Sequence, residues 1–173
     1  MTTMTTRLVS AAAVTALSAA GLVGLAASPA AASDMRCNGT LRSVKTDRNI
    51  VVRPGATCII ERSTIDGNIT IGTNGTLRIS SSRVDGNIQS KNHRWAIITN
   101  TVVDGDIQLE RGQSATVNRN RIDGDIQLFS NRGRNSVSSN RVDGNIQCKG
   151  NRNGVQGSGN RVDGNKEDQC RRI

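Results

Sequence analysis

The chain has 173 residues, with 23 lysines and arginines against 14 aspartates and glutamates, and a net charge of +9 at pH 7. Trp95 and Phe129 are its only large aromatic residues, which excludes the multi-aromatic stacking platforms that bind single-stranded nucleic acids. The basic excess favours anionic polymers as partners, or serves the solubility of an extracellular protein.

The first 32 residues have the pattern of a secretory signal peptide. Arg7 precedes an alanine-rich apolar run, 8–27, and the small residues 30–32 suit cleavage before Ser33. A transmembrane anchor is the alternative, but the run is weakly apolar and no basic stop-transfer cluster follows it. We therefore predict a secreted protein, extracellular or associated with the cell wall, with a single domain at 33–173 and no membrane span after leader removal. Cleavage would remove only one charged residue, Arg7, which lowers the net charge from +9 to +8.

A repeat dominates the rest of the chain. A half-repeat at 49–55 precedes six copies of a pentapeptide of the form Val/Ile-Asp-Gly-Asn/Asp-Ile, the last of which ends in Lys166 instead of isoleucine. The aspartates lie at positions 66, 85, 104, 123, 143 and 163, in steps of 19, 19, 19, 20 and 20. A fixed period in this range is typical of a solenoid.

Each repeat has the pattern of short strands. Apolar residues alternate with polar ones and are mostly β-branched, which indicates strands with one buried face. We predict an all-β, right-handed parallel β-helix of six to seven coils, because one coil cannot bury its own inner face. The glycine after each aspartate indicates a corner where the backbone is left-handed or crowded. A polar column lies three places before the aspartates and predicts a hydrogen-bonded ladder; it comprises Ser63, Ser82, Thr101, Asn120, Asn140 and Asn160.

Four cysteines lie near the two ends of the predicted solenoid. Outside the cytoplasm thiols oxidise, and four cysteines allow three pairings. Locality in a stacked fold favours Cys37 with Cys58 and Cys148 with Cys170. Zinc binding is disfavoured, because no pair has the Cys-x-x-Cys spacing and the chain has a single histidine. Polar residues enter the core columns at 166 and 168, so the solenoid is expected to end there.

The coils resemble those of bactofilins, within the right-handed parallel β-helix class. The start Cys37-Asn38-Gly39-Thr40 and the ending Gly-Asn-Lys-Glu-Asp-Gln-Cys at 164–170 resemble those of small exported β-helix proteins of high-GC Gram-positive bacteria. The resemblance covers nearly all of 33–173 and implies a fold and an extracellular location. The leader and cysteines depart from bactofilins, which form cytoplasmic filaments. Pectate lyases and polygalacturonases share the architecture, but their groove-forming loops do not fit coils of 19 or 20 residues.

Three groups of residues are candidate sites. The segment 90–95 departs most from the repeat, and His93, Arg94 and an outward-pointing Trp95 form a candidate binding surface, although a tryptophan that lies flat over a corner and covers a gap is the favoured interpretation. Arg121, Arg141 and Arg161 form a second candidate, although a charge-compensated surface is the favoured interpretation of that column. Calcium is considered at a cluster of acidic residues in adjacent coils, although the glycine-rich nonapeptide of calcium-binding solenoids is absent. That cluster consists of Asp104, Asp106, Asp123 and Asp125.

Regular repetition explains the aspartates without catalysis, so we expect no catalytic residues, no enzymatic activity and no cofactor. The sequence favours a solenoid with a structural or binding role at the cell envelope, on partners such as cell-wall or acidic polysaccharides. A specific nucleic-acid partner is not expected. The alternatives are a polysaccharide lyase or hydrolase of the β-helix class and a self-assembling scaffold, and the oligomeric state stays open.

Overall fold

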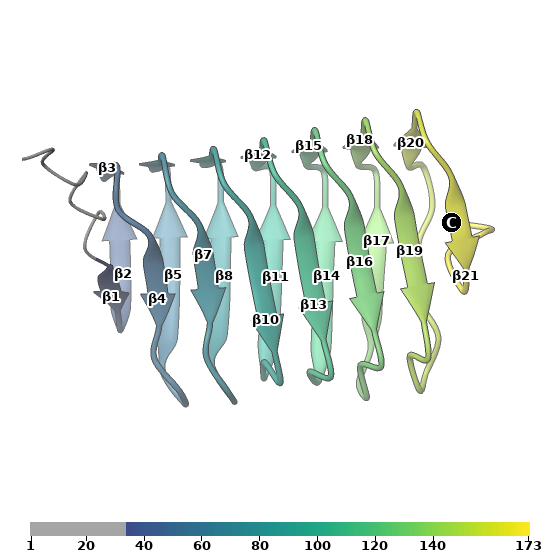
Figure 1. The fold of residues 1–173 in the computed structure, drawn as a ribbon, viewed down its shortest axis with the longest axis horizontal. Helices are drawn as coiled ribbons and strands as arrows, with labels where there is room; N and C mark the ends of the chain where they lie inside the picture. The colour runs from purple at the N-terminus through teal and green to yellow at the C-terminus, as the bar shows by residue number, and fades with distance from the viewer. Residues whose placement is uncertain (1–33) are drawn as a thin grey trace, which may run out of the picture. The chain divides into compact units, whose positions relative to one another are not determined.

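The computed structural model describes residues 34–173, and the predicted leader lies outside them. This part of the chain is all β, with 21 strands in three parallel sheets. Successive coils stack along one axis, and each sheet runs along that axis (Figure 1). Sheet A contains β1 (Met35–Cys37), β4 (Ile50–Val52), β7 (Ile69–Ile71), β10 (Ile88–Lys91), β13 (Ile107–Glu110), β16 (Ile126–Phe129), β19 (Ile146–Lys149) and β21 (Lys166–Asp168). Sheet B contains β2 (Gly39–Arg42), β5 (Thr57–Glu61), β8 (Thr76–Ser80), β11 (Trp95–Thr99), β14 (Ser114–Asn118) and β17 (Asn135–Ser138). Sheet C contains β3 (Lys45–Thr46), β6 (Thr64–Ile65), β9 (Arg83–Val84), β12 (Val102–Val103), β15 (Arg121–Ile122), β18 (Arg141–Val142) and β20 (Arg161–Val162).

Each strand pairs in parallel with the equivalent strand of the next coil, which confirms a parallel β-solenoid of about seven coils. The predicted half-repeat is part of it, since Ile50 pairs with Ile69. The inward isoleucines of sheet A, such as Ile88 and Ile107, are fully buried. Successive coils therefore enclose one continuous apolar core, as the alternating pattern predicts.

The predicted polar ladder lies between sheets B and C and is confirmed. Asn120 donates its side-chain Nδ2 to Asn140 Oδ1 at 3.0 Å, and Asn140 donates in the same way to Asn160 at 3.0 Å. The side-chain oxygens also accept backbone N–H groups, as Asn120 Oδ1 does from Thr101 at 3.0 Å. Buried polar groups at this corner are thus satisfied from coil to coil.

The glycine corner lies between sheets C and A, and its glycines are required by crowding. A Cβ on Gly105 would lie 2.4 Å from Asn87 Oδ1 and 2.9 Å from the Gly86 carbonyl oxygen. Left-handed residues stand elsewhere. One column lies four places before the aspartates, at Arg62, Ser81, Asn100, Arg119, Ser139 and Gly159, and a second follows sheet A, at Asn92, Arg111, Ser130 and Gly150. Of the two predicted causes, a crowded backbone is therefore the one that applies to the glycine corner.

Disulfide bonds join neighbouring coils near each end of the solenoid. Cys37 bonds to Cys58 and Cys148 bonds to Cys170, as locality predicts. The last sheet A strand, β21, carries Lys166, whose Nζ donates to an oxygen of Ile173 at 2.7 Å. Two disulfides are typical of proteins outside the reducing cytoplasm.

Within residues 34–173 there is no helix of the length and apolar character that a membrane span requires.

Candidate functional site

The aspartate corner, formed by the aspartates of the repeat and the arginines two places before them, carries paired charges. Arg121 forms ion pairs with Asp123 of its own coil at 3.0 Å and with Asp143 of the next coil at 2.8 Å. Arg83 bridges Asp85 and Asp104 in the same way, and Arg141 bridges Asp143 and Asp163 at 3.6 and 3.7 Å. Arg161 has no following repeat and makes no ion pair within the described residues. Most of this column is therefore charge-compensated, as its spacing predicts.

The aspartates of the calcium hypothesis are engaged in the fold. Asp106 Oδ1 accepts the backbone N–H of Asp125 at 2.8 Å, and Asp125 Oδ1 accepts that of Asn145 at 2.6 Å. Asp104 and Asp123 are held by the arginine pairs of the aspartate corner. No group of three or more histidines, cysteines or acidic residues within 34–173 is arranged to hold a metal ion. The geometry gives the calcium hypothesis no support.

The segment 90–95 is divided between surface and interior. Trp95 is 41% exposed at the start of β11, in the same column as Thr76 and Ser114, so it points outward as predicted. The Arg94 guanidinium lies 4.5 Å from the centre of its ring, a cation–π contact. His93 is only 1% exposed and lies inside the coil. The structure thus brings Arg94 and Trp95 together on the surface without His93.

The position of His93 follows from a second ladder, between sheets A and B, that the sequence analysis missed. Asn131 Nδ2 donates to Asn151 Oδ1 at 3.1 Å, and Asn151 Nδ2 donates to Gln169 Oε1 at 3.0 Å. Gly112 occupies this turn position in the preceding coil, and its backbone N–H donates to Asn131 Oδ1 at 2.8 Å. His93 stands one coil earlier, and its ring fills the space above Gly112, where a Cβ would lie 2.1 Å from the imidazole.

The buried imidazole has no polar compensation. Neither ring nitrogen has a hydrogen-bond partner within the described residues, and burial lowers the pKa of His93 to about 4. The amides of Asn131 and Asn151 donate to the carbonyls of Leu109 and Leu128 in the coils before them. Ser90 makes the corresponding bond in the coil of His93, since its Oγ donates to the Ile71 carbonyl at 2.9 Å. This bond explains why a serine interrupts the apolar core column at 90.

A strip of cations follows the turns that join sheet A to sheet B. We call it the basic corner; it consists of Lys91, Arg94, Arg111, Arg132, Arg134, Lys149 and Arg152, all exposed. Glu110 is the only acidic residue in the segments 91–95, 110–114, 129–135 and 149–156. It lies 3.7 Å from Arg111, and the other basic-corner residues make no ion pair within residues 34–173. The net positive charge of the protein is therefore concentrated beside Trp95 and away from the aspartate corner.

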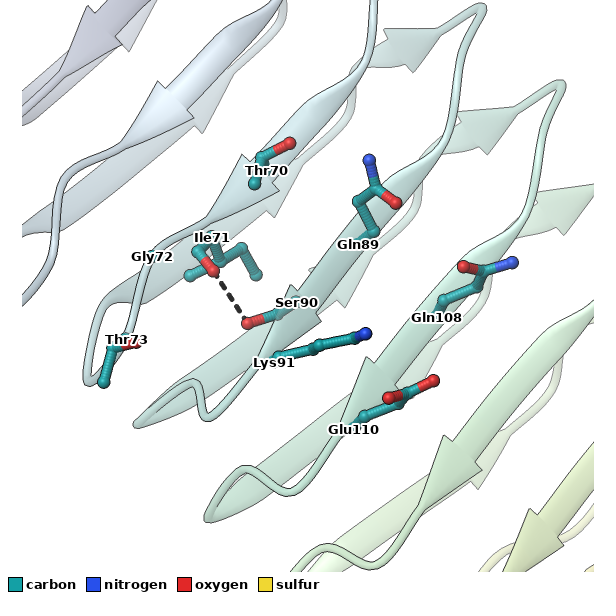
Figure 2. Close-up of a pocket in the computed structure, with 9 residues that line it drawn as sticks. All are labelled: Thr70, Ile71, Gly72, Thr73, Gln89, Ser90, Lys91, Gln108 and Glu110. Carbon is teal, nitrogen blue, oxygen red and sulfur yellow. Dashed lines mark hydrogen bonds between the residues drawn. The ribbon is translucent and has the colours of Figure 1, made fainter.

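A hollow of about 310 Å³ adjoins the basic corner on the outer face of sheet A. Figure 2 shows Thr70, Gln89 and Gln108 in one row across β7, β10 and β13, with Lys91 and Glu110 in a second row nearer the turns. The second row begins at Gly72, which has no side chain, so the space beside Lys91 stays open. A second hollow of about 290 Å³ lies farther along the same corner and is lined by Arg134, Asn135, Asn153 and Gln156.

Comparison of the chain with protein-family models, with curated proteins and with solved structures gives no match. Its function is therefore inferred from the placement of these side chains.

Proposed function

We propose that this protein is a non-enzymatic solenoid of the cell envelope that binds a linear anionic polymer along its basic corner. The observation that carries the proposal is the separation of charge between two corners of one coil. Arginines of the aspartate corner bridge carboxylates of two coils, whereas basic-corner residues other than Arg111 have no carboxylate partner within 34–173. Cations without such partners are free to neutralise a ligand.

The repeat distance suits a polymer that runs along the solenoid axis. The backbone N–H of Arg152 donates to the Asn131 carbonyl at 2.9 Å, and that of Arg132 donates to the Gly112 carbonyl at 2.9 Å. Arg132 and Arg152 therefore occupy the same turn position in adjacent coils, roughly 4.8 Å apart as parallel strands are. A chain with charges along its length meets cations without carboxylate partners in the described residues at the coils of Lys91, Arg132 and Arg152, whereas Arg111 in the coil after Lys91 is paired with Glu110. Binding would release counterions from the polymer and fall steeply with salt.

The basic corner is tested by removing three of its charges. The triple variant Arg132→Gln, Arg134→Gln, Arg152→Gln is expected to weaken binding to inorganic polyphosphate about 10-fold or more at 0.1 M salt, because each lost cation removes one ionic contact. The slope of log K against log salt concentration is expected to fall by about 2. Fluorescence anisotropy with labelled polyphosphate measures both quantities.

The matched control removes the same net charge from the aspartate corner. In Arg83→Gln, Arg121→Gln, Arg141→Gln the lost arginines already had carboxylate partners, so binding is expected to change by about 3-fold or less. Circular dichroism verifies that both variants keep their strands. Equal losses in the two triples would mean that only net charge matters, and the proposed site would be wrong.

A further inference from the structure

The hollow beside Lys91 has the volume of a small-ligand site and is lined mostly by polar residues. Its volume of about 310 Å³ is at the small end of the range of about 300–1,000 Å³ for such sites. It lies on sheet A, across β7, β10 and β13 and beside the turn that follows β7. A space of this size suits a small ligand, such as a single ring of a polymer.

The lining groups include hydrogen-bond donors and acceptors that the fold leaves unused. In later coils the glutamines of the Gln89 column are hydrogen-bonded, since Gln127 donates to Gln147 at 3.2 Å and Gln147 donates to Glu167 at 3.2 Å. The side chain of Gln89, in the hollow, has no hydrogen-bond partner in the described part of the chain. An amide both donates and accepts. It therefore matches a ring that carries hydroxyl groups better than a chain of phosphates, which only accepts.

The charged residues that line the hollow also favour a hydroxylated ring over a chain of phosphates. Lys91 makes no ion pair within 34–173, so its ammonium is available to an anionic substituent. Glu110 lines the same hollow and would repel a bare polyanion, but its carboxylate accepts hydrogen bonds from hydroxyl groups. A ligand that satisfies both must carry hydroxyls together with a separate negative group.

We propose that this hollow holds a sugar ring of the polymer that lies along the basic corner, so that the ligand is an anionic glycan. This inference rests on the proposed function and narrows it. Lys91 belongs both to the hollow and to the basic corner, so a ring held there is continuous with a chain that runs past Arg94 and Arg111. Gln89 holds ring hydroxyls, and Lys91 pairs with the acidic group of the same or the adjacent sugar.

The test compares matched pairs of variants on three probes. Gln89→Ala alters the hollow, whereas Gln127→Ala alters the same column outside it. Lys91→Gln and Lys149→Gln each remove one basic-corner cation from the same column, and only Lys91 borders the hollow. The probes are oligogalacturonate, a sulfated galactan oligomer and inorganic polyphosphate of similar charge. The first two distinguish a carboxylate from a sulfate as the anionic group.

We expect the protein to bind at least one sugar oligomer more tightly than polyphosphate. Gln89→Ala is expected to weaken that oligomer about 10-fold, the effect of losing hydrogen bonds worth roughly 1.4 kcal/mol, and to leave polyphosphate binding unchanged. Lys91→Gln should weaken the sugar oligomer more than Lys149→Gln does. Equal effects of Gln89→Ala on all probes, or no effect on any, would overturn the glycan site while leaving polyphosphate binding by the basic corner intact. If the triple variant Arg132→Gln, Arg134→Gln, Arg152→Gln also binds polyphosphate as tightly as the unaltered protein does, both proposals fail.

Discussion

Replacing Asn140 by alanine is expected to lower the free energy of unfolding by about 3–5 kcal/mol. Asn140 is 2% exposed, and its Oδ1 accepts from the backbone N–H and the Nδ2 of Asn120 at 2.9 and 3.0 Å. Its Nδ2 donates to the Val117 carbonyl at 2.9 Å and to Asn160 Oδ1 at 3.0 Å. Alanine leaves several of these groups buried without partners, at about 1–3 kcal/mol each. Urea unfolding with the disulfides intact measures the loss.

The chain supplies its own controls for this ladder. Serine occupies the same column at 63 and 82, where Ser82 Oγ accepts the Ser63 backbone N–H at 3.1 Å. Asn140→Ser should therefore keep one of the bonds and cost about half as much as alanine. Asn118→Ala, on the half-exposed outer face of β14, should change stability by about 0.5 kcal/mol or less. A loss at Asn140 no larger than that at Asn118 would show that the ladder contributes nothing net.

The features that could be predicted from the sequence are those that every coil repeats. The core columns and the ladder at 120, 140 and 160 follow from one environment stacked many times, and the two disulfides follow from the closeness of neighbouring coils. Each coil presents the same face to the next, so a residue's column largely determines whether it is buried. The polar residues of its column, Thr76 and Ser114, predict an outward position for Trp95, and its 41% exposure agrees, although Thr76 itself is only 5% exposed.

The basic corner repeats only in part, because the turns after sheet A differ in length and composition. Arg94, Arg132 and Arg152 each stand nine places after an aspartate of the pentapeptide, and Lys91 and Lys149 stand six places after one, but Arg111 and Arg134 stand seven and eleven places after theirs. The paired backbone of adjacent coils places all of them along the same corner. The sequence does show that acidic residues are scarce in these segments, a signal that counting charge turn by turn could have found.

The interior position of His93 is hidden for a different reason, because it depends on residues in other coils. Gly112 makes room for its ring, and Ser90 satisfies the Ile71 carbonyl that a ladder amide would otherwise reach. Neither compensation is visible within the segment 90–95 itself. A histidine flanked by arginine and tryptophan therefore has the pattern of a surface site, although packing places it inside.

The second large effect is a pH dependence that arises from this residue. Through His93 the protein is expected to lose about 3 kcal/mol of stability as the pH falls from 6.5 to 4. Burial lowers its pKa from the usual 6.5 to about 4 in the folded state, so in this range the unfolded chain takes up a proton that the folded chain does not. Above pH 6.5 both states are neutral, and stability from this source is fully present. Urea unfolding from pH 7.5 to 4 measures the loss.

Comparison with His93→Asn isolates this contribution from the carboxylates that titrate in the same range. Asparagine fills the same turn position at 131 and 151, so the variant should fold and lack the histidine-linked loss. The free energy of unfolding of the variant, relative to that of the unaltered protein, should be about 3 kcal/mol higher at pH 4 than at pH 7.5. Identical pH profiles of the two proteins would mean that the imidazole is not buried.

Gly112→Asn provides a further check, because its Cβ would meet the imidazole at 2.1 Å. It should destabilise the protein strongly when His93 is present and little in His93→Asn, where the two asparagines would extend the ladder, and a double-mutant cycle measures that coupling.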